Sequence, residues 1–217
     1  MKLTIALLFV VILGTHGTAY GLDGRINNGE YVSSDKLFRV PVPVMRNPFI
    51  KKPSVISDER RSDGGVEVNF SVMDLGEAWR FGARPLAIEL STEKMALTEI
   101  CDAELKRWVQ ATSNGDIVLE ENIQREEGPA IARIYYVESA TLLFVKHGEG
   151  PAKRESALIG VIAILVQQEK RVLYVVGQFD MPNRGGHYTL ETERGRKKLA
   201  EEHLRRLREL SSSLKPQ

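Results

Sequence analysis

Hydrophobic and polar residues alternate along several segments of the chain, which is the pattern of β-strands. In residues 66–72, valine and phenylalanine alternate with Glu67, Asn69 and Ser71, which predicts a strand with one buried and one solvent-exposed face. Residues 37–45 also alternate, but Pro41 and Pro43 limit them to an edge strand or an extended entry segment. Further strands are predicted at 79–90, 117–123, 130–137 and 141–145, and a surface loop at 47–65.

The two most apolar segments of the central region are Leu158–Val166 and Val172–Val176. A short polar stretch, residues 167–171, separates them and predicts an antiparallel hairpin. Because both segments are apolar at nearly every position, we expect central strands that are covered on both faces.

Two segments have helical periodicity, 91–112 and 190–210. Each carries one polar residue on its apolar face, Glu104 in the first and His203 in the second. A buried carboxylate there would have a raised pKa and could serve as a general acid or base. The alternative, which we prefer, is a structural side chain at the margin of the face or paired with an arginine or a backbone group.

The order of these elements predicts one α+β domain over residues 20–217, with a single, mostly antiparallel sheet flanked by helices. The chain resembles the PsbP-like α/β/α sandwich family in Glu30-Tyr31-Val32-Ser33-Ser34, in Leu37-Phe38-Arg39-Val40-Pro41 and in the hairpin sequence Lys170-Arg171-Val172-Leu173-Tyr174-Val175. The exported start, the mid-chain helix and the C-terminal helix belong to the same resemblance. The resemblance implies a fold whose members mostly serve as non-catalytic accessory or binding subunits.

Residues 1–19 have the pattern of a signal peptide. Lys2 is followed by an apolar run at 3–13, and the small residues Gly17 and Ala19 precede the expected cleavage point. The run is too short for a membrane span. Cys101 is the only cysteine, so no intramolecular disulfide can form. We therefore predict a periplasmic or secreted protein of a bacterial envelope, with no stable membrane span after cleavage.

Charge and composition narrow the possible partners. The formal net charge is +1 for 217 residues, so no overall field favours nucleic acid, and we predict no nucleic-acid partner. Cys101 lies among apolar residues of the first helix, where a buried thiol with a packing role is expected. The sequence contains no catalytic triad and no metal-ligand spacing. We therefore predict that the protein has no catalytic residues, no cofactor and no bound metal.

Two glycine-rich loops carry the remaining candidate residues, His147, Glu149, Asp180, Arg184 and His187. If these loops meet at one end of the sheet, they form a surface for a ligand or a protein partner. The sequence favours a non-catalytic envelope protein that binds a protein or a small ligand. The alternative is a periplasmic, hydrolase-like enzyme that uses the histidines and carboxylates of these loops.

Overall fold

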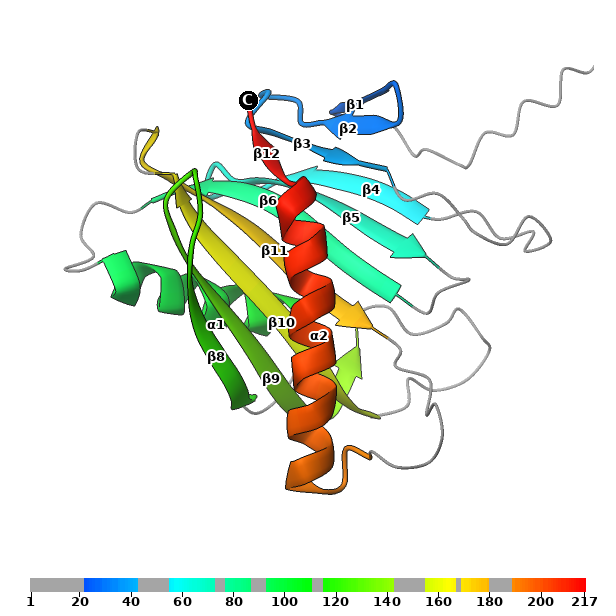
Figure 1. Cartoon of the computed structure of the whole chain (residues 1–217). Coiled ribbons are helices and arrows are strands. Elements are labelled where there is room, and N and C mark those ends of the chain that lie inside the picture. The colour runs from blue at the N-terminus through cyan, green and yellow to red at the C-terminus, as the bar shows by residue number, and fades with distance from the viewer. Residues whose placement is uncertain are drawn as a thin grey trace, which may run out of the picture.

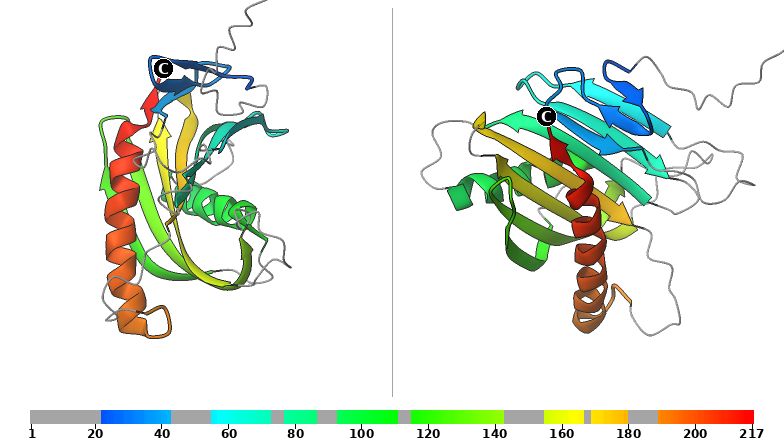
Figure 2. Two further views of the ribbon diagram at one scale, coloured as in Figure 1. Left: turned by 90° about the vertical axis from the view of Figure 1, so that its right-hand side faces the viewer. Right: turned by 45° about the horizontal axis from the view of Figure 1, so that its top comes forward.

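Two helices lie on opposite faces of a large antiparallel β-sheet, as Figure 1 and the side view in Figure 2 show. This is a computed structural model, and it describes residues 22–42, 55–72, 77–86, 93–110, 115–142, 155–166, 169–179 and 189–217. Helix α1 (Glu93–Trp108) packs on one face of the sheet, and helix α2 (Glu193–Ser213) packs on the other. The predicted α+β class with mostly antiparallel pairing is confirmed.

The large sheet has eight strands among the described residues. Their order is β4-β5-β6-β11-β10-β9-β7, and β8 also pairs with β9. The bounds are β4 Val55–Arg60, β5 Val66–Val72, β6 Glu77–Pro85, β7 Val109–Gln110, β8 Asp116–Gln124, β9 Pro129–Leu142, β10 Glu155–Val166 and β11 Arg171–Phe179.

The hairpin of β10 and β11 lies at the centre of this sheet, as predicted. Ile162 pairs with Val175, and the hairpin has β9 on one side and β6 on the other. Both faces are covered: Ile162 and Leu173 face α2, whereas Val161 and Val172 face α1, and all four are buried. Nearly continuous apolarity is therefore explained by the helix on each side.

The prediction of a single sheet is wrong, because the described chain forms a second, four-stranded sheet in the order β1-β2-β3-β12. Its strands are β1 Arg25–Asn27, β2 Glu30–Val32, β3 Phe38–Pro41 and β12 Lys215–Pro216. Asn28 and Gly29 have φ angles of 50° and 78°, which suit the two-residue turn of a hairpin. The strand after α2 pairs with β3, a contact between the two ends of the chain that no local pattern encodes.

Three further element predictions differ from the structure. Residues 55–60, predicted as loop, form β4 at the edge of the large sheet, where charged side chains can face solvent. The strands predicted at 130–137 and 141–145 are joined in β9, which the structure describes to Leu142. Helix α2 continues through Ser213, and within it the hydroxyls of Ser211, Ser212 and Ser213 each donate to the backbone carbonyl three residues earlier.

Candidate functional site

The five residues predicted to form a ligand or partner surface, His147, Glu149, Asp180, Arg184 and His187, lie outside the described residues. The enzyme alternative rests on the same loops. Residues 1–19, predicted as a signal peptide, are also outside the described part. The polar groups that the structure does bring together lie elsewhere, between α1 and the sheet.

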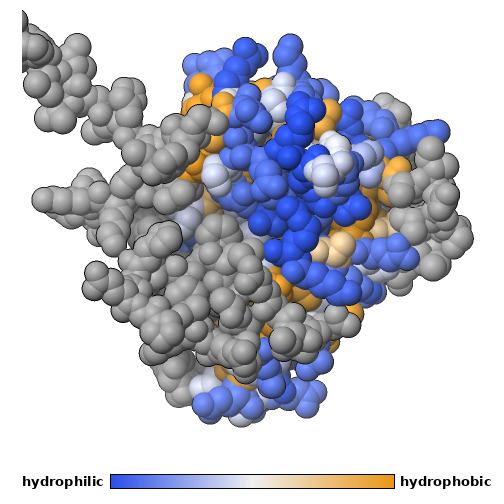
Figure 3. Space-filling view, turned by 180° about the vertical axis from the view of Figure 1, so that it is seen from behind, coloured by the Kyte–Doolittle hydropathy of each residue, from blue (hydrophilic) through white to orange (hydrophobic). Residues whose placement is uncertain are grey.

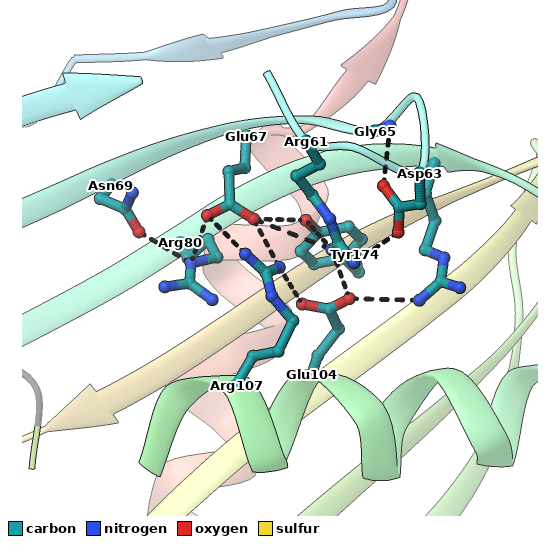
Figure 4. Close-up of polar contacts among 10 residues, drawn as sticks. Arg61, Asp63, Gly65, Glu67, Asn69, Arg80, Glu104, Arg107 and Tyr174 are labelled. Carbon is teal, nitrogen blue, oxygen red and sulfur yellow. Dashed lines mark hydrogen bonds and ion pairs between the residues drawn. The ribbon is translucent and has the colours of Figure 1, made fainter. Parts of the chain in front are cut away.

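Helix α1 directs two charged side chains, Glu104 and Arg107, toward the sheet from positions one turn apart (Figure 4). Glu104 Oε1 accepts a hydrogen bond from Arg61 Nη1 at 2.7 Å, and Oε2 accepts one from Arg107 Nη1 at 3.0 Å. Arg84 Nη1 also donates to Glu104 Oε1, at 3.4 Å. The Glu104 side chain is fully buried, and its carboxylate is paired with three arginines instead of being hydrated.

Strand β5 contributes a second buried carboxylate, Glu67, which the alternating pattern of residues 66–72 had assigned to a solvent-exposed face. Arg107 donates to both of its oxygens, at 2.8 and 3.2 Å, and Tyr174 Oη donates at 2.9 Å. Arg80 Nε lies 3.2 Å from Glu67 Oε1 and donates to Asn69 Oδ1 at 2.8 Å. The exposed-face prediction is wrong at Glu67, because the side chains of Arg107 from α1 and Arg80 from β6 cover it, whereas Asn69 and Ser71 on the same face are partly exposed.

We call these side chains the α1 cluster: Arg61, Asp63, Glu67, Arg80, Arg84, Glu104, Arg107 and Tyr174. Four arginines face three carboxylates in it. Burial raises the pKa of Glu67, but the Arg107 hydrogen bond and the charges of Arg80 and Arg107 outweigh burial and hold it below its usual value. Burial and the charges of Glu104 and Glu67 raise the pKa of Tyr174 above its ordinary value.

The directions of these pKa shifts determine which chemical roles the α1 cluster can have. A general acid needs a carboxyl that holds its proton near neutral pH, and Glu67 is shifted the opposite way. Glu104 is paired with arginines, which confirms the structural interpretation preferred from the sequence. The cluster therefore joins α1 to β5 and β6 by ion pairs, and Tyr174 of β11 is joined to it by hydrogen bonds.

A smaller ion cluster lies on the other side of α1. Arg133 Nη1 donates to Asp102 Oδ1 at 3.0 Å, and Tyr135 Oη donates to the same oxygen at 2.7 Å. Arg133 Nε also donates to Glu120 Oε2 at 2.9 Å. The arginine side chain is 11% exposed, whereas that of Asp102 is 50% exposed and that of Glu120 is 30% exposed. The guanidinium of Arg133 is thus nearly buried, and the carboxylates of Asp102 and Glu120 lie around it at the surface.

Two shallow cavities lie on this side of α1, over β8 and β9. The first, of about 310 Å³, is lined by Leu97 of α1, Ile131 of β9 and the end of β8 around Asn122. The second, of about 240 Å³, is lined by Leu105 of α1, Ile117 of β8 and neighbouring residues that include Asp102 and Tyr135. Figure 3 views the molecule from behind and shows hydrophilic residues across the middle of this face, with hydrophobic residues beside them.

The two remaining residues of interest from the sequence are buried. Cys101 is fully buried between α1 and the sheet, and burial raises the pKa of its thiol, which confirms its packing role. His203 is fully buried under α2, and its Nε2 lies 3.3 Å from the Gly177 carbonyl oxygen. The edge of its ring packs on Phe179 with the ring centroids 4.3 Å apart. Neither side chain is open to a substrate.

Among the described residues, no three histidine, cysteine, aspartate or glutamate side chains lie close enough together to hold a metal ion. Within the same residues, no helix combines the length and the apolarity that a membrane crossing requires.

Comparison with known proteins identifies a similar fold. No protein-family model matches the chain, and no curated protein matches it. A solved structure of the Saccharomyces cerevisiae Ran-binding protein Mog1p is 12% identical, with a TM-score of 0.48 over 90% of this chain and 96% of that one. A point mutant of protein Mog1 is 14% identical, with a TM-score of 0.50 over 88% and 96% of the two chains. The second likeness shows a shared fold.

These structures contradict the predictions of a signal peptide, of a secreted or periplasmic location and of an envelope partner. The solved protein that shares the fold is described as protein Mog1 and not as an envelope or secreted protein. The prediction rested on a short apolar run followed by small residues, a compositional pattern with little information in it.

Sequence reasoning found Glu104 but missed the rest of the α1 cluster. The usable signal was the pair of Glu104 and Arg107, three residues apart at the edge of an apolar helix face. Glu67 offered no such signal, because an alternating strand with a polar face has the same pattern whether water or a charged helix covers that face. The arginines come from separate elements, and only the tertiary structure brings them together.

Proposed function

We propose that this chain is a non-catalytic binding protein that recognises a protein partner through the face that carries α1. The observation that carries the proposal is the pairing of the two buried carboxylates, Glu67 and Glu104, with arginines. This pairing removes the groups best placed for acid–base chemistry. It also joins α1 to the sheet, while Asp102 and Arg133 join its other side to β9.

The form of this face favours a protein over a small ligand. Sites for small molecules are usually enclosed cavities of roughly 300–1,000 Å³. The two cavities beside α1, of about 310 and 240 Å³, are at or below that range. A surface that is already ordered loses little conformational freedom on binding, and the ion pairs on both sides of α1 supply that order.

We also propose that the chain has the PsbP-like α/β/α sandwich that its sequence resembles. Helices on opposite faces of an antiparallel sheet support this proposal. The members of that family mostly act as accessory or binding subunits, which agrees with the proposed function.

Site-specific photo-crosslinking in the native cell tests the proposed function. Glu99 of α1 and Glu202 of α2 are both exposed glutamates on helices, and they form a matched pair on opposite faces. Each is replaced in turn by p-benzoylphenylalanine, and adducts are identified by mass spectrometry. We expect one discrete protein adduct from position 99 and none from position 202. Equal labelling from both positions, or no adduct from position 99, contradicts the proposal.

A further inference from the structure

Strand β8 has an unpaired outer edge among the described residues. It pairs with β9 on one side, and no described strand lies on the other. At nine residues it is longer than a typical edge strand. An edge of this kind offers a row of backbone N–H and C=O groups to an added strand, which is a common mode of peptide recognition.

Apolar surface lies directly beside this edge. Ile117 is 49% exposed, and the other exposed large hydrophobic residue of the described chain is Ile26 of β1, at 46%. The two cavities beside α1 lie one after the other along β8. Leu97 lines the first and Leu105 the second. Side chains from a strand paired with β8 would enter these cavities.

The charges along the edge select the kind of strand. Three acidic residues lie in β8, Asp116, Glu120 and Glu121, and no basic one. Two copies paired through β8 would bring these carboxylates close to each other, which disfavours a dimer. Along β8, Glu120 lies between Ile117 of the second cavity and Asn122 of the first. Asp102 lines the second cavity, and the arginine that pairs with both carboxylates, Arg133, is nearly buried. Of the described residues that line the second cavity, Lys106 is the one exposed cation.

We propose that β8 and the groove beside it bind an extended, basic segment of another protein as an added β-strand. This inference rests on the proposed function and names the site and the partner chemistry. Two apolar side chains of the segment fill the two cavities, and a lysine or arginine between them pairs with the carboxylates of Asp102 and Glu120.

The spacing of the cavities gives the sequence pattern of the segment. Leu97 and Leu105 are eight residues apart on a helix, which corresponds to about 12 Å at 1.5 Å per residue. An extended strand covers about 13 Å in four residues, and alternate side chains share a face. The recognised pattern is therefore apolar, any residue, basic, any residue, apolar.

Fluorescence anisotropy with a labelled synthetic peptide tests this inference on the purified full chain. The probe matches β8 in length, with isoleucine, arginine and leucine at its third, fifth and seventh positions and threonine elsewhere. A second peptide has glutamate in place of the arginine. Two more carry N-methyl groups on alternate backbone amides, in the two possible registers. Because alternate amides of a strand point in opposite directions, only one register blocks pairing with β8.

A matched pair of variants provides the control on the protein. Ile117→Asp places a charge in the groove, and Ile26→Asp places the same charge at an equally exposed site on the other sheet. We expect saturable binding of the basic probe, at least tenfold weaker binding to Ile117→Asp and unchanged binding to Ile26→Asp. The glutamate peptide should bind at least tenfold more weakly, and one N-methyl register should abolish binding.

Several outcomes overturn the inference. These are no saturable binding of the basic probe, equal effects of the two variants, equal effects of the two N-methyl registers, or equal affinity for the glutamate peptide. A dimer in sedimentation equilibrium that Ile117→Asp dissociates would assign the edge to a second copy instead. If the peptide fails while position 99 still crosslinks to a protein, the proposed function stands and only this inference is lost.

Discussion

The buried imidazole of His203 should make the protein sensitive to mild acid. His203 lies fully buried between α2 and the sheet, with Gly160 and Phe179 beside it. Burial lowers its pKa to about 4, and the hydrogen bond to the Gly177 carbonyl opposes this shift only in part. No charged group contributes to the shift, and Nδ1 has no hydrogen-bond partner. Protonation of the folded state therefore buries an unpaired positive charge.

The size and sign of the effect follow from the two pKa values. In the unfolded chain His203 has its ordinary pKa of about 6.5, so between pH 6.5 and 4 the unfolded state binds the extra proton. The free energy of unfolding is thus highest above pH 6.5 and falls as the pH drops toward 4. A shift from 6.5 to about 4 corresponds to roughly 3 kcal/mol in total, of which roughly 2 kcal/mol is lost by pH 5.

Urea unfolding at pH 7.5, 6 and 5, followed by the fluorescence of the buried Trp79 and Trp108, measures this loss. His203→Leu is the control, because leucine fills a similar volume and cannot bind a proton. All other titrating groups are common to both proteins, so the difference between their pH dependences isolates His203. If His203→Leu loses as much unfolding free energy between pH 7.5 and 5 as the unmodified protein, the reasoning is refuted.

Four further predictions concern the core and the α1 cluster. Ile162→Ala should lower the free energy of unfolding in urea by about 2–5 kcal/mol, and a smaller change would show that Ile162 is not in a central strand. In the same assay Glu67→Gln should lower the free energy of unfolding by about 3–5 kcal/mol, because it removes the carboxylate charge that is paired with Arg80 and Arg107. Tyr174→Phe, which removes one hydrogen bond to that carboxylate, should lower it by about 1.5–3 kcal/mol. A Cβ at Gly82 would overlap the ring of Tyr174, so Gly82→Ala should lower the free energy of unfolding by about 1–3 kcal/mol. An equally stable variant would refute this packing. Cys101 should resist Ellman's reagent in the native protein and react in 8 M urea, and rapid native labelling would contradict its burial.

The sequence predicted well those elements that depend on residues near each other in the chain. It predicted poorly those that depend on pairing with distant segments. The hairpin of β10 and β11 was predictable because its apolar residues are continuous and the interruption at residues 167–171 is polar. Strand β4 was missed because its charged residues have the composition of a loop, and only its pairing with β5 makes it a strand. Burial of Cys101 and pairing of Glu104 were both predictable, since each lies on an apolar helix face.

By itself, the sequence determined the periodicities of β5, of the β10 and β11 hairpin and of both helices, and it determined that the hairpin strands must be covered on both faces. These properties depend on neighbours within a few residues, and hydrophobic burial enforces them. Only the tertiary structure decided that Arg107 of α1 pairs with Glu67 of β5, that arginines from separate elements meet Glu67 and Glu104, and that β12 pairs with β3. Such contacts join residues far apart in the chain. Their energies depend on distance and on the exclusion of water, which no local pattern records.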